Sequence, residues 1–241
     1  MSYSCLEELQ VDLDLHNLDK TNILSKIGCQ YDKGWFVVTD DGICHLFAKN
    51  GNLDNIKKIK QLTEKHIRKD ITKIVIPDSV TSIGDYAFEY CSGLTSVMIP
   101  DSVTSIGYDA FYGCKGLTSI TIPNSVKSIG GAAFCDCYRL MSLTIGNGVM
   151  SIGMDAFSYC NRLTNVMIPD SIMSIEHTAF YECIRLTSVM IGQGITSIED
   201  YAFKNCWSLR NLTFKNKTLE QVKKMKGYPW GIKDESIIHV E

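Results

Sequence analysis

The sequence predicts a repeat solenoid, specifically a right-handed β-solenoid of short parallel strands with a cap at each end. A unit of 23 residues recurs six times between Pro77 and Phe214. One position of the unit is always a large apolar residue, at Ile76, Ile99, Ile122, Ile145, Ile168, Ile191 and Phe214. Ala-Phe pairs and cysteines keep the same spacing. A chain with this period stacks its units so that each buries its apolar side against its neighbours.

The first element of each unit is a short strand. In Leu94-x-x-Val97-x-Ile99 the three apolar side chains face inward. Stacked copies lie ~4.8 Å apart in a parallel ladder. We therefore expect seven parallel strands, which start near Ile71, Leu94, Leu117, Leu140, Leu163, Leu186 and Leu209.

The rest of the unit turns the chain and returns it. Proline follows the strand in four units, and Gly146 and Gly192 replace it in two others. Both residue types favour turns. Val80-x-x-Ile83 provides a second short inward-facing segment. The Ala-Phe pair follows on the return path, where we expect the alanine to allow close approach and the phenylalanine to fill the interior.

This motif resembles the BspA-type leucine-rich repeat over residues 71–214, with I-P or I-G, S-I, A-F, C and L in register. The family occurs on bacterial and protozoan surfaces. The resemblance implies a curved leucine-rich-repeat-like solenoid used in adhesion or protein recognition. It implies no cofactor and no catalytic residue.

The chain divides into residues 1–70, 71–214 and 215–241. The first part is interpreted as an N-terminal cap or a small α+β domain. It contains a helical segment over 5–27, a hairpin around Asp40-Asp41-Gly42, and an amphipathic capping helix over 55–67. The last part is a C-terminal cap with a helix over 218–225, a turn with two large rings over 228–231, and a final strand over 236–240.

Charge and hydropathy restrict the partners. The net charge is −3, which does not favour nucleic acid. There is no run of 18 apolar residues, so we expect no membrane insertion. The N-terminal residues lack the basic and apolar parts of a secretory signal, which favours a cytoplasmic location, with the cell surface as the alternative.

Six of the ten cysteines form a ladder at the 23-residue spacing, from Cys91 to Cys206. We interpret them as buried, reduced thiols without metal, because stacked side chains leave neighbouring coils in the same direction. The others are Cys5, Cys29, Cys44 and Cys135, and they form no C-x-x-C pair.

No catalytic, metal-binding or cofactor-binding motif is present. The five histidines are scattered, and the serines occupy repeat positions. The sequence therefore predicts that the protein is not an enzyme.

Positions that vary between repeats indicate where a partner binds. Six tyrosines on the return path, interleaved with acidic residues, are the candidate partner-binding residues: Tyr86, Tyr90, Tyr108, Tyr112, Tyr159 and Tyr181. The alternative role of these rings is to shield the phenylalanines from water. The outward strand positions form a second candidate surface, with Met98, Met167 and Met190.

The leading hypothesis is a non-enzymatic protein-protein interaction module. One alternative is a surface adhesin or virulence-associated repeat protein exported without a recognisable signal. Another is a structural subunit of a larger assembly, such as a phage particle.

Overall fold

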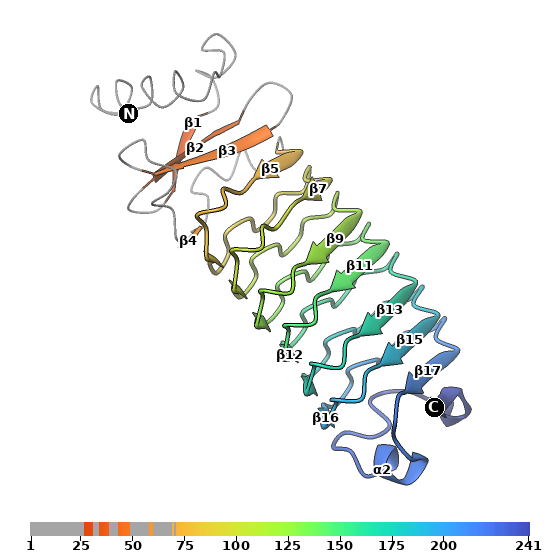
Figure 1. The fold of residues 1–241 in the computed structure, drawn as a ribbon. Helices are drawn as coiled ribbons and strands as arrows, with labels where there is room; N and C mark the ends of the chain where they lie inside the picture. The colour runs from red at the N-terminus through yellow and green to blue at the C-terminus, as the bar shows by residue number, and fades with distance from the viewer. Residues whose placement is uncertain (1–26, 31–33, 39–42, 49–57, 60–68, 70) are drawn as a thin grey trace.

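The computed structural model describes residues 27–30, 34–38, 43–48, 58–59, 69 and 71–241. From residue 71 onward the chain forms stacked coils of 23 residues, arranged along one axis (Figure 1). We number these coils 1 to 6, and they cover residues 71–93, 94–116, 117–139, 140–162, 163–185 and 186–208.

The first side of the solenoid is the predicted row of strands, which we call the strand face. Its pairs β5–β7, β9–β11, β13–β15 and β15–β17 are parallel, and most partners are 23 residues apart. The seven parallel strands that the sequence predicts are confirmed: β5 (Lys73–Val75), β7 (Ser96–Val97), β9 (Ser119–Ile122), β11 (Ser142–Ile145), β13 (Asn165–Ile168), β15 (Ser188–Ile191) and β17 (Asn211–Phe214).

A second ladder of two-residue strands lies across the interior from the first. Each strand is a Ser-Ile pair whose isoleucine is buried, apart from the first, which is Lys58–Ile59. The ladder is continuous and parallel through β4 (Lys58–Ile59), β6 (Ser82–Ile83), β8 (Ser105–Ile106), β10 (Ser128–Ile129), β12 (Ser151–Ile152), β14 (Ser174–Ile175) and β16 (Ser197–Ile198). The predicted inward segment is confirmed, since Val80 and Ile83 are both buried.

A column of phenylalanine rings fills the centre of the coils. Phe134 is fully buried, with its ring centroid 5.1 Å from that of Phe111 and 5.4 Å from that of Phe157. These rings are nearly parallel to one another, at 5° and 2°. The alanine before each phenylalanine is also buried, which lets neighbouring coils approach closely. Buried aromatic and aliphatic side chains therefore fill the interior, as the sequence predicts.

The cysteine ladder lies beside this column, and its predicted burial is confirmed. The eight cysteines whose side chains are described are all buried, and none of them forms a disulfide. The surroundings of the ladder are not wholly apolar, because each ladder thiol from coil 2 onward donates a hydrogen bond to the phenylalanine carbonyl oxygen of the preceding coil. In coil 3 the Cys137 Sγ lies 3.4 Å from the Phe111 carbonyl oxygen. The same contact occurs at Cys114, Cys160, Cys183 and Cys206, at 3.1–3.4 Å.

The strand ladder continues toward the N-terminus. β1 (Ile27–Gln30), β2 (Gly34–Val38) and β3 (Ile43–Ala48) form antiparallel pairs, which confirms the predicted hairpin, and β3 pairs in parallel with β5. The predicted helix over 55–67 is wrong at β4, because Lys58 and Ile59 pair with the edge of β6. Backbone groups at that edge gain strand partners that a helix would not provide. The predicted helical segment over 5–27 lies outside the described residues except at Ile27, which is in a strand.

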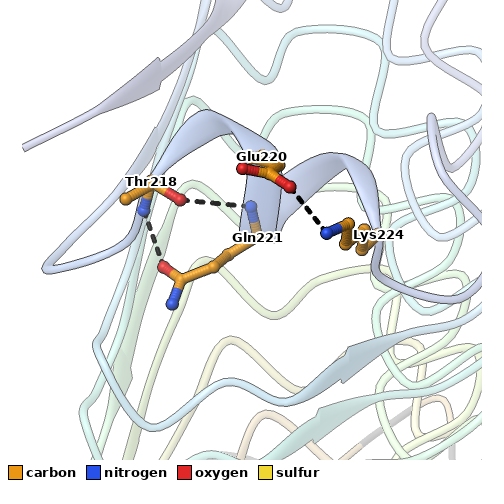
Figure 2. Close-up of polar contacts among 4 residues, drawn as sticks. All are labelled: Thr218, Glu220, Gln221 and Lys224. Atoms are coloured by element: carbon orange, nitrogen blue, oxygen red, sulfur yellow. Dashed lines mark hydrogen bonds and ion pairs between the residues drawn. The ribbon is translucent and has the colours of Figure 1, made fainter.

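The C-terminal cap closes the other end. The predicted helix is confirmed as α2 (Leu219–Lys223), whose N-cap Thr218 exchanges hydrogen bonds with Gln221 in a capping box (Figure 2). Lys224 pairs with Glu220 one turn away. A 3-10 helix (Glu235–Ile237) and β18 (Ile238–Val240) follow, and β18 adds to β17 in parallel.

The predicted aromatic turn closes the interior. The Trp230 side chain is fully buried, and its ring centroid lies 5.6 Å from that of Phe214. Its ring nitrogen donates to the Lys226 carbonyl oxygen at 2.9 Å. The turn therefore covers the last coil.

Candidate functional site

The return path, defined here as the turn between the second ladder and the next strand of the first, has an unusual backbone. Two residues of each coil have a positive φ, and eleven of these twelve are not glycine. Their φ angles are 50–62°, in the left-handed region that costs a side-chain-bearing residue ~1–2 kcal/mol. The first position holds Tyr86, Asp109, Ala132, Asp155, Thr178 and Tyr201, and the second holds Tyr90, Gly113, Asp136, Tyr159, Glu182 and Asn205.

This backbone places alternate N–H groups toward the next coil. In coil 1 the N–H groups of Tyr86, Phe88 and Tyr90 donate to carbonyl oxygens of coil 2 at 2.7–2.8 Å. The N–H groups between them donate three residues back within the same coil. Backbone hydrogen bonds therefore fix the path, and the side chains at the left-handed positions can differ between coils.

The predicted tyrosines form edge-to-face pairs between neighbouring coils. The ring centroids of Tyr86 and Tyr108 are 5.5 Å apart, those of Tyr90 and Tyr112 are 5.2 Å apart, and those of Tyr159 and Tyr181 are 5.5 Å apart. The first two pairs share coils 1 and 2, and the third pair lies on coils 4 and 5. The structure therefore divides the six predicted residues into a group of four and a group of two.

These rings are partly accessible to a partner. The exposed fractions of Tyr90 and Tyr108 are 51% and 49%, whereas Tyr112 and Tyr181 are half-buried. Two glycines make room for them. A Cβ on Gly113 would lie 2.7 Å from the Tyr90 ring, and one on Gly131 would lie 3.2 Å from the Tyr108 ring. Each ring thus packs on backbone on one side and is exposed on the other.

Carboxylates lie among the tyrosines. Burial and the nearby charges of Glu89 and Asp155 together raise the pKa of Asp109 to about 6, although a hydrogen bond with the Tyr108 side chain acts in the opposite direction. Asp136 forms an ion pair with Lys115 at 3.0 Å. Burial, followed by the charge of Asp155, raises the pKa of the Cys135 thiol to about 12. We call residues 84–91 and the equivalent residues of coils 2 to 6 the return surface, and its net charge is negative in every coil.

The strand face offers a different surface. Met98 and Met167 are 81% and 63% exposed, while Met190 is half-buried. A shallow hollow of about 630 Å³ on β7, β9 and β11 is lined mainly by serine, threonine, asparagine and Met98. A second hollow of about 410 Å³ includes Met167. The sequence did not reveal these hollows, because their lining residues come from several neighbouring coils.

Two features of the return surface were not predicted from the sequence. The left-handed positions carry an excess of Asp, Asn and Gly, which is the residue signal for a positive φ. Coil 3 has small side chains at Gly131 and Ala132, where both neighbouring coils have larger ones, and at Cys135, where coil 2 has Tyr112. Both features are visible in the sequence when the same position is compared across the six repeats.

The described residues also lack the cluster of ligands that a metal site requires. Within them, no three His, Cys, Asp or Glu side chains are grouped so that they could hold a metal ion. The same part of the chain contains no helix that is long and apolar enough to cross a membrane.

The comparison with known families decides the classification. A family model described as the BspA type leucine rich repeat region, in six copies, matches residues 57–183 and 127–226. The chain belongs to this family. BspA-type leucine-rich repeat proteins commonly mediate protein interaction or adhesion and are typically not enzymes. No curated protein matches this chain.

Solved leucine-rich repeat structures agree with the fold of this BspA-type chain. A protein from Eubacterium ventriosum is 26% identical, with a TM-score of 0.66 over 83% of this chain and 50% of its own. The T. pallidum leucine rich repeat protein is also 26% identical, with a TM-score of 0.59 over 76% of this chain and 79% of its own. A Bacteroides ovatus protein at 21% identity, with a TM-score of 0.51, supports the fold alone. This BspA-type chain spans half the length of the Eubacterium ventriosum protein.

Proposed function

We propose that this chain is a non-enzymatic protein-interaction module and that its partner contacts the return surface. The observation that carries the proposal is the four tyrosines of coils 1 and 2, which lie in two edge-to-face pairs and of which Tyr86, Tyr90 and Tyr108 are exposed. Tyrosine gives a large contact area with little loss of rotamer freedom, so rigid rings of this kind anchor partners.

Two arguments favour this surface over the strand face. The return surface carries both aromatic rings and a negative charge, which together provide contact area and steering of a partner. The strand-face hollows around Met98 and Met167 contain no aromatic ring and are lined by aliphatic and small polar side chains with few charges. Its hollows make it the alternative docking surface.

The test compares partner capture by two sets of variants. The first variant changes Tyr86, Tyr108 and Tyr112 to serine, and the second changes Met98, Met167 and Met190 to serine. Both are checked for native circular dichroism and melting temperature. We expect the tyrosine variant to lose partners from the source cell and the methionine variant to keep them. The opposite result assigns binding to the strand face and refutes the proposal.

We also propose a cytoplasmic location, because none of the eight cysteines whose side chains are described forms a disulfide, and thiols stay reduced in the cytoplasm. Fractionation of the source cell, with alkylation of thiols during lysis, tests this. Recovery of the protein at the cell surface would support the alternative of an adhesin.

A further inference from the structure

One column of the return surface places two carboxylates on either side of a methyl group. Asp109, Ala132 and Asp155 occupy the same left-handed position in coils 2, 3 and 4. Parallel strands stack ~4.8 Å apart, so the α-carbons of the two aspartates are ~10 Å apart. Only the Ala132 side chain lies between them in this column. The spacing leaves room for one additional side chain whose charged end could contact both carboxylates.

Tyrosine rings border the same position. The Tyr108 ring packs against Gly131 of coil 3. The hydroxyls of Tyr112 in coil 2 and Tyr159 in coil 4 both interact with the Cys135 thiol of coil 3, which raises their pKa values further after burial and the paired tyrosine. Coil 3 is therefore a strip of small side chains with aromatic and acidic groups from both neighbouring coils.

The protein already places its own lysines on this surface. In coil 6 the Lys204 Nζ lies 4.4 Å from the centre of the Tyr201 ring, which is a cation–π contact. Lys115, at the end of coil 2, pairs with Asp136 of coil 3. Among the ion pairs described in residues 71–241, none involves Asp109 or Asp155. These two carboxylates are thus left to attract a cation from outside the chain.

We infer that the partner presents a lysine- or arginine-rich segment, and that one of its cations lies over Ala132 between Asp109 and Asp155. This inference rests on the proposed function, since it assigns the partner class of the return surface. Charge complementarity selects the partner, and the tyrosine rings add cation–π and apolar contacts to the stem of the side chain.

The electrostatics of Asp109 predict a pH dependence of binding. The groups that face this carboxylate are Glu89 of coil 1, Tyr108 of its own coil and Asp155 of coil 4. Burial and the like charges raise its pKa to about 6, so it is ionised above that pH and protonated below it. A bound cation favours the ionised form. The affinity for a basic segment therefore falls as the pH decreases through 6.

The experiment measures binding of a fluorescent oligolysine peptide to the full chain by anisotropy, with an oligoglutamate peptide as the negative control. The test variant is D109N/D155N, and the matched control D78N/D101N removes two exposed charges elsewhere. We expect about threefold weaker binding for each carboxylate lost from the site, or about tenfold for the double variant. The control stays within about twofold of the unchanged protein.

A second pair of variants tests the position itself. Ala132→Lys supplies an internal cation between the two aspartates and should abolish oligolysine binding, whereas Ala132→Gln adds similar length without charge and should weaken it less. The pH dependence should be present in the unchanged protein and largely lost in Asp109→Asn.

The outcomes separate the two proposals. Equal losses in D109N/D155N and D78N/D101N, or no loss in either, overturn the inference of a basic partner. If that happens while the Tyr86, Tyr108 and Tyr112 variant still loses its partner, the return surface remains the docking site. If the tyrosine variant keeps its partner, the proposed function itself fails.

Discussion

The strand face and the return surface of the solenoid are held in place by different means. On the strand face, extended backbone alternates side chains inward and outward, so burial fixes half of the residues in each strand. On the return surface, left-handed residues and hydrogen bonds between coils fix the path. The strand positions are therefore nearly uniform between repeats, whereas the left-handed positions hold Tyr, Asp, Ala, Thr, Gly, Glu or Asn.

The difference shows how a repeat protein gains a specific surface without changing its fold. A change at a strand position risks the packing of the interior. A change at a left-handed position alters mainly the side chain that a partner would contact. The same regularity that makes the strand face uniform thus leaves the return side free to vary.

Alkaline pH should have the largest effect and should act on the return side, where the buried thiols lie. Burial raises the pKa values of Cys137, Cys160, Cys183 and Cys206, the last to about 12. Their stabilising contribution is complete below the ordinary thiol pKa of 9.0 and is lost as the pH rises toward the folded value. Four thiols remove about 5 kcal/mol per pH unit. We expect the protein to unfold within about two units above pH 9, followed by circular dichroism.

The control for this prediction measures how steeply the unfolding free energy depends on pH. In urea titrations at several pH values, Cys137→Ala should reduce the pH dependence of the unfolding free energy by about 1.4 kcal/mol per pH unit. A slope unchanged from that of the native protein would show that the ladder thiols do not govern alkaline stability.

Loss of a stacked ring should be the most destabilising substitution. Phe134→Ala leaves a cavity between Phe111 and Phe157, and we expect a loss of about 3–5 kcal/mol in unfolding free energy. Tyr138→Ala, an exposed ring in the same coil, should cost less than about 0.5 kcal/mol. Similar losses in both, measured by urea unfolding, would mean that surface rings contribute as much as the interior.

A smaller effect distinguishes the left-handed positions. Gly113→Ala puts a Cβ at φ +69° and within 2.7 Å of the Tyr90 ring, so we expect a loss of about 2 kcal/mol. Ala132→Gly relieves a left-handed alanine but increases the freedom of the unfolded chain, and the two effects nearly cancel, within about 1 kcal/mol. Thermal unfolding of the two variants checks the contrast. If Gly113→Ala is neutral, the backbone of the return path is less constrained than the hydrogen bonds indicate.

The smallest effect has the opposite sign. Because Asp109 has a raised pKa of about 6, its ionised form is less stable in the folded protein, and this penalty is present above pH 6 and absent below 3.8. Asp109→Asn should therefore stabilise the protein at neutral pH, by less than about 1 kcal/mol since the group is largely exposed. Asp85→Ala should destabilise it, because the Asp85 carboxylate accepts the Tyr108 N–H at 2.9 Å. Calorimetry at two pH values measures both.

Sequence reasoning recovered the parts of the fold that repeat. The register of the seven strands and the buried phenylalanines follow from residue patterns within one unit, and the α2 helix follows from the local pattern after the last repeat. The helix predicted over 55–67 was wrong at Lys58–Ile59 because a neighbouring strand edge outweighed a local apolar period. Local patterns do not show such long-range pairing.

The candidate surface was predicted only as a composition. The tyrosine residues were identified from their repeat positions, but their pairing across 22 residues required the relative tilt of neighbouring coils. The thiol contacts with the phenylalanine carbonyls were missed, because the acceptor is on the preceding coil, 26 residues away. The position of Ala132 could not be singled out from composition, because its role depends on Asp109 and Asp155 lying on either side of it.

The stacking of the coils also determines how the protein responds to a pulling force. Each coil is hydrogen-bonded to the coil before it and the coil after it, and β18 is added to the last strand in the same way. Tension applied to the C-terminus therefore acts first on β18 and the cap, then on one coil at a time. Each released coil of 23 residues lengthens the tether by about 80 Å. The solenoid would therefore extend in steps of equal length, one for each coil that unfolds, while the coils that are still folded keep their return surface intact.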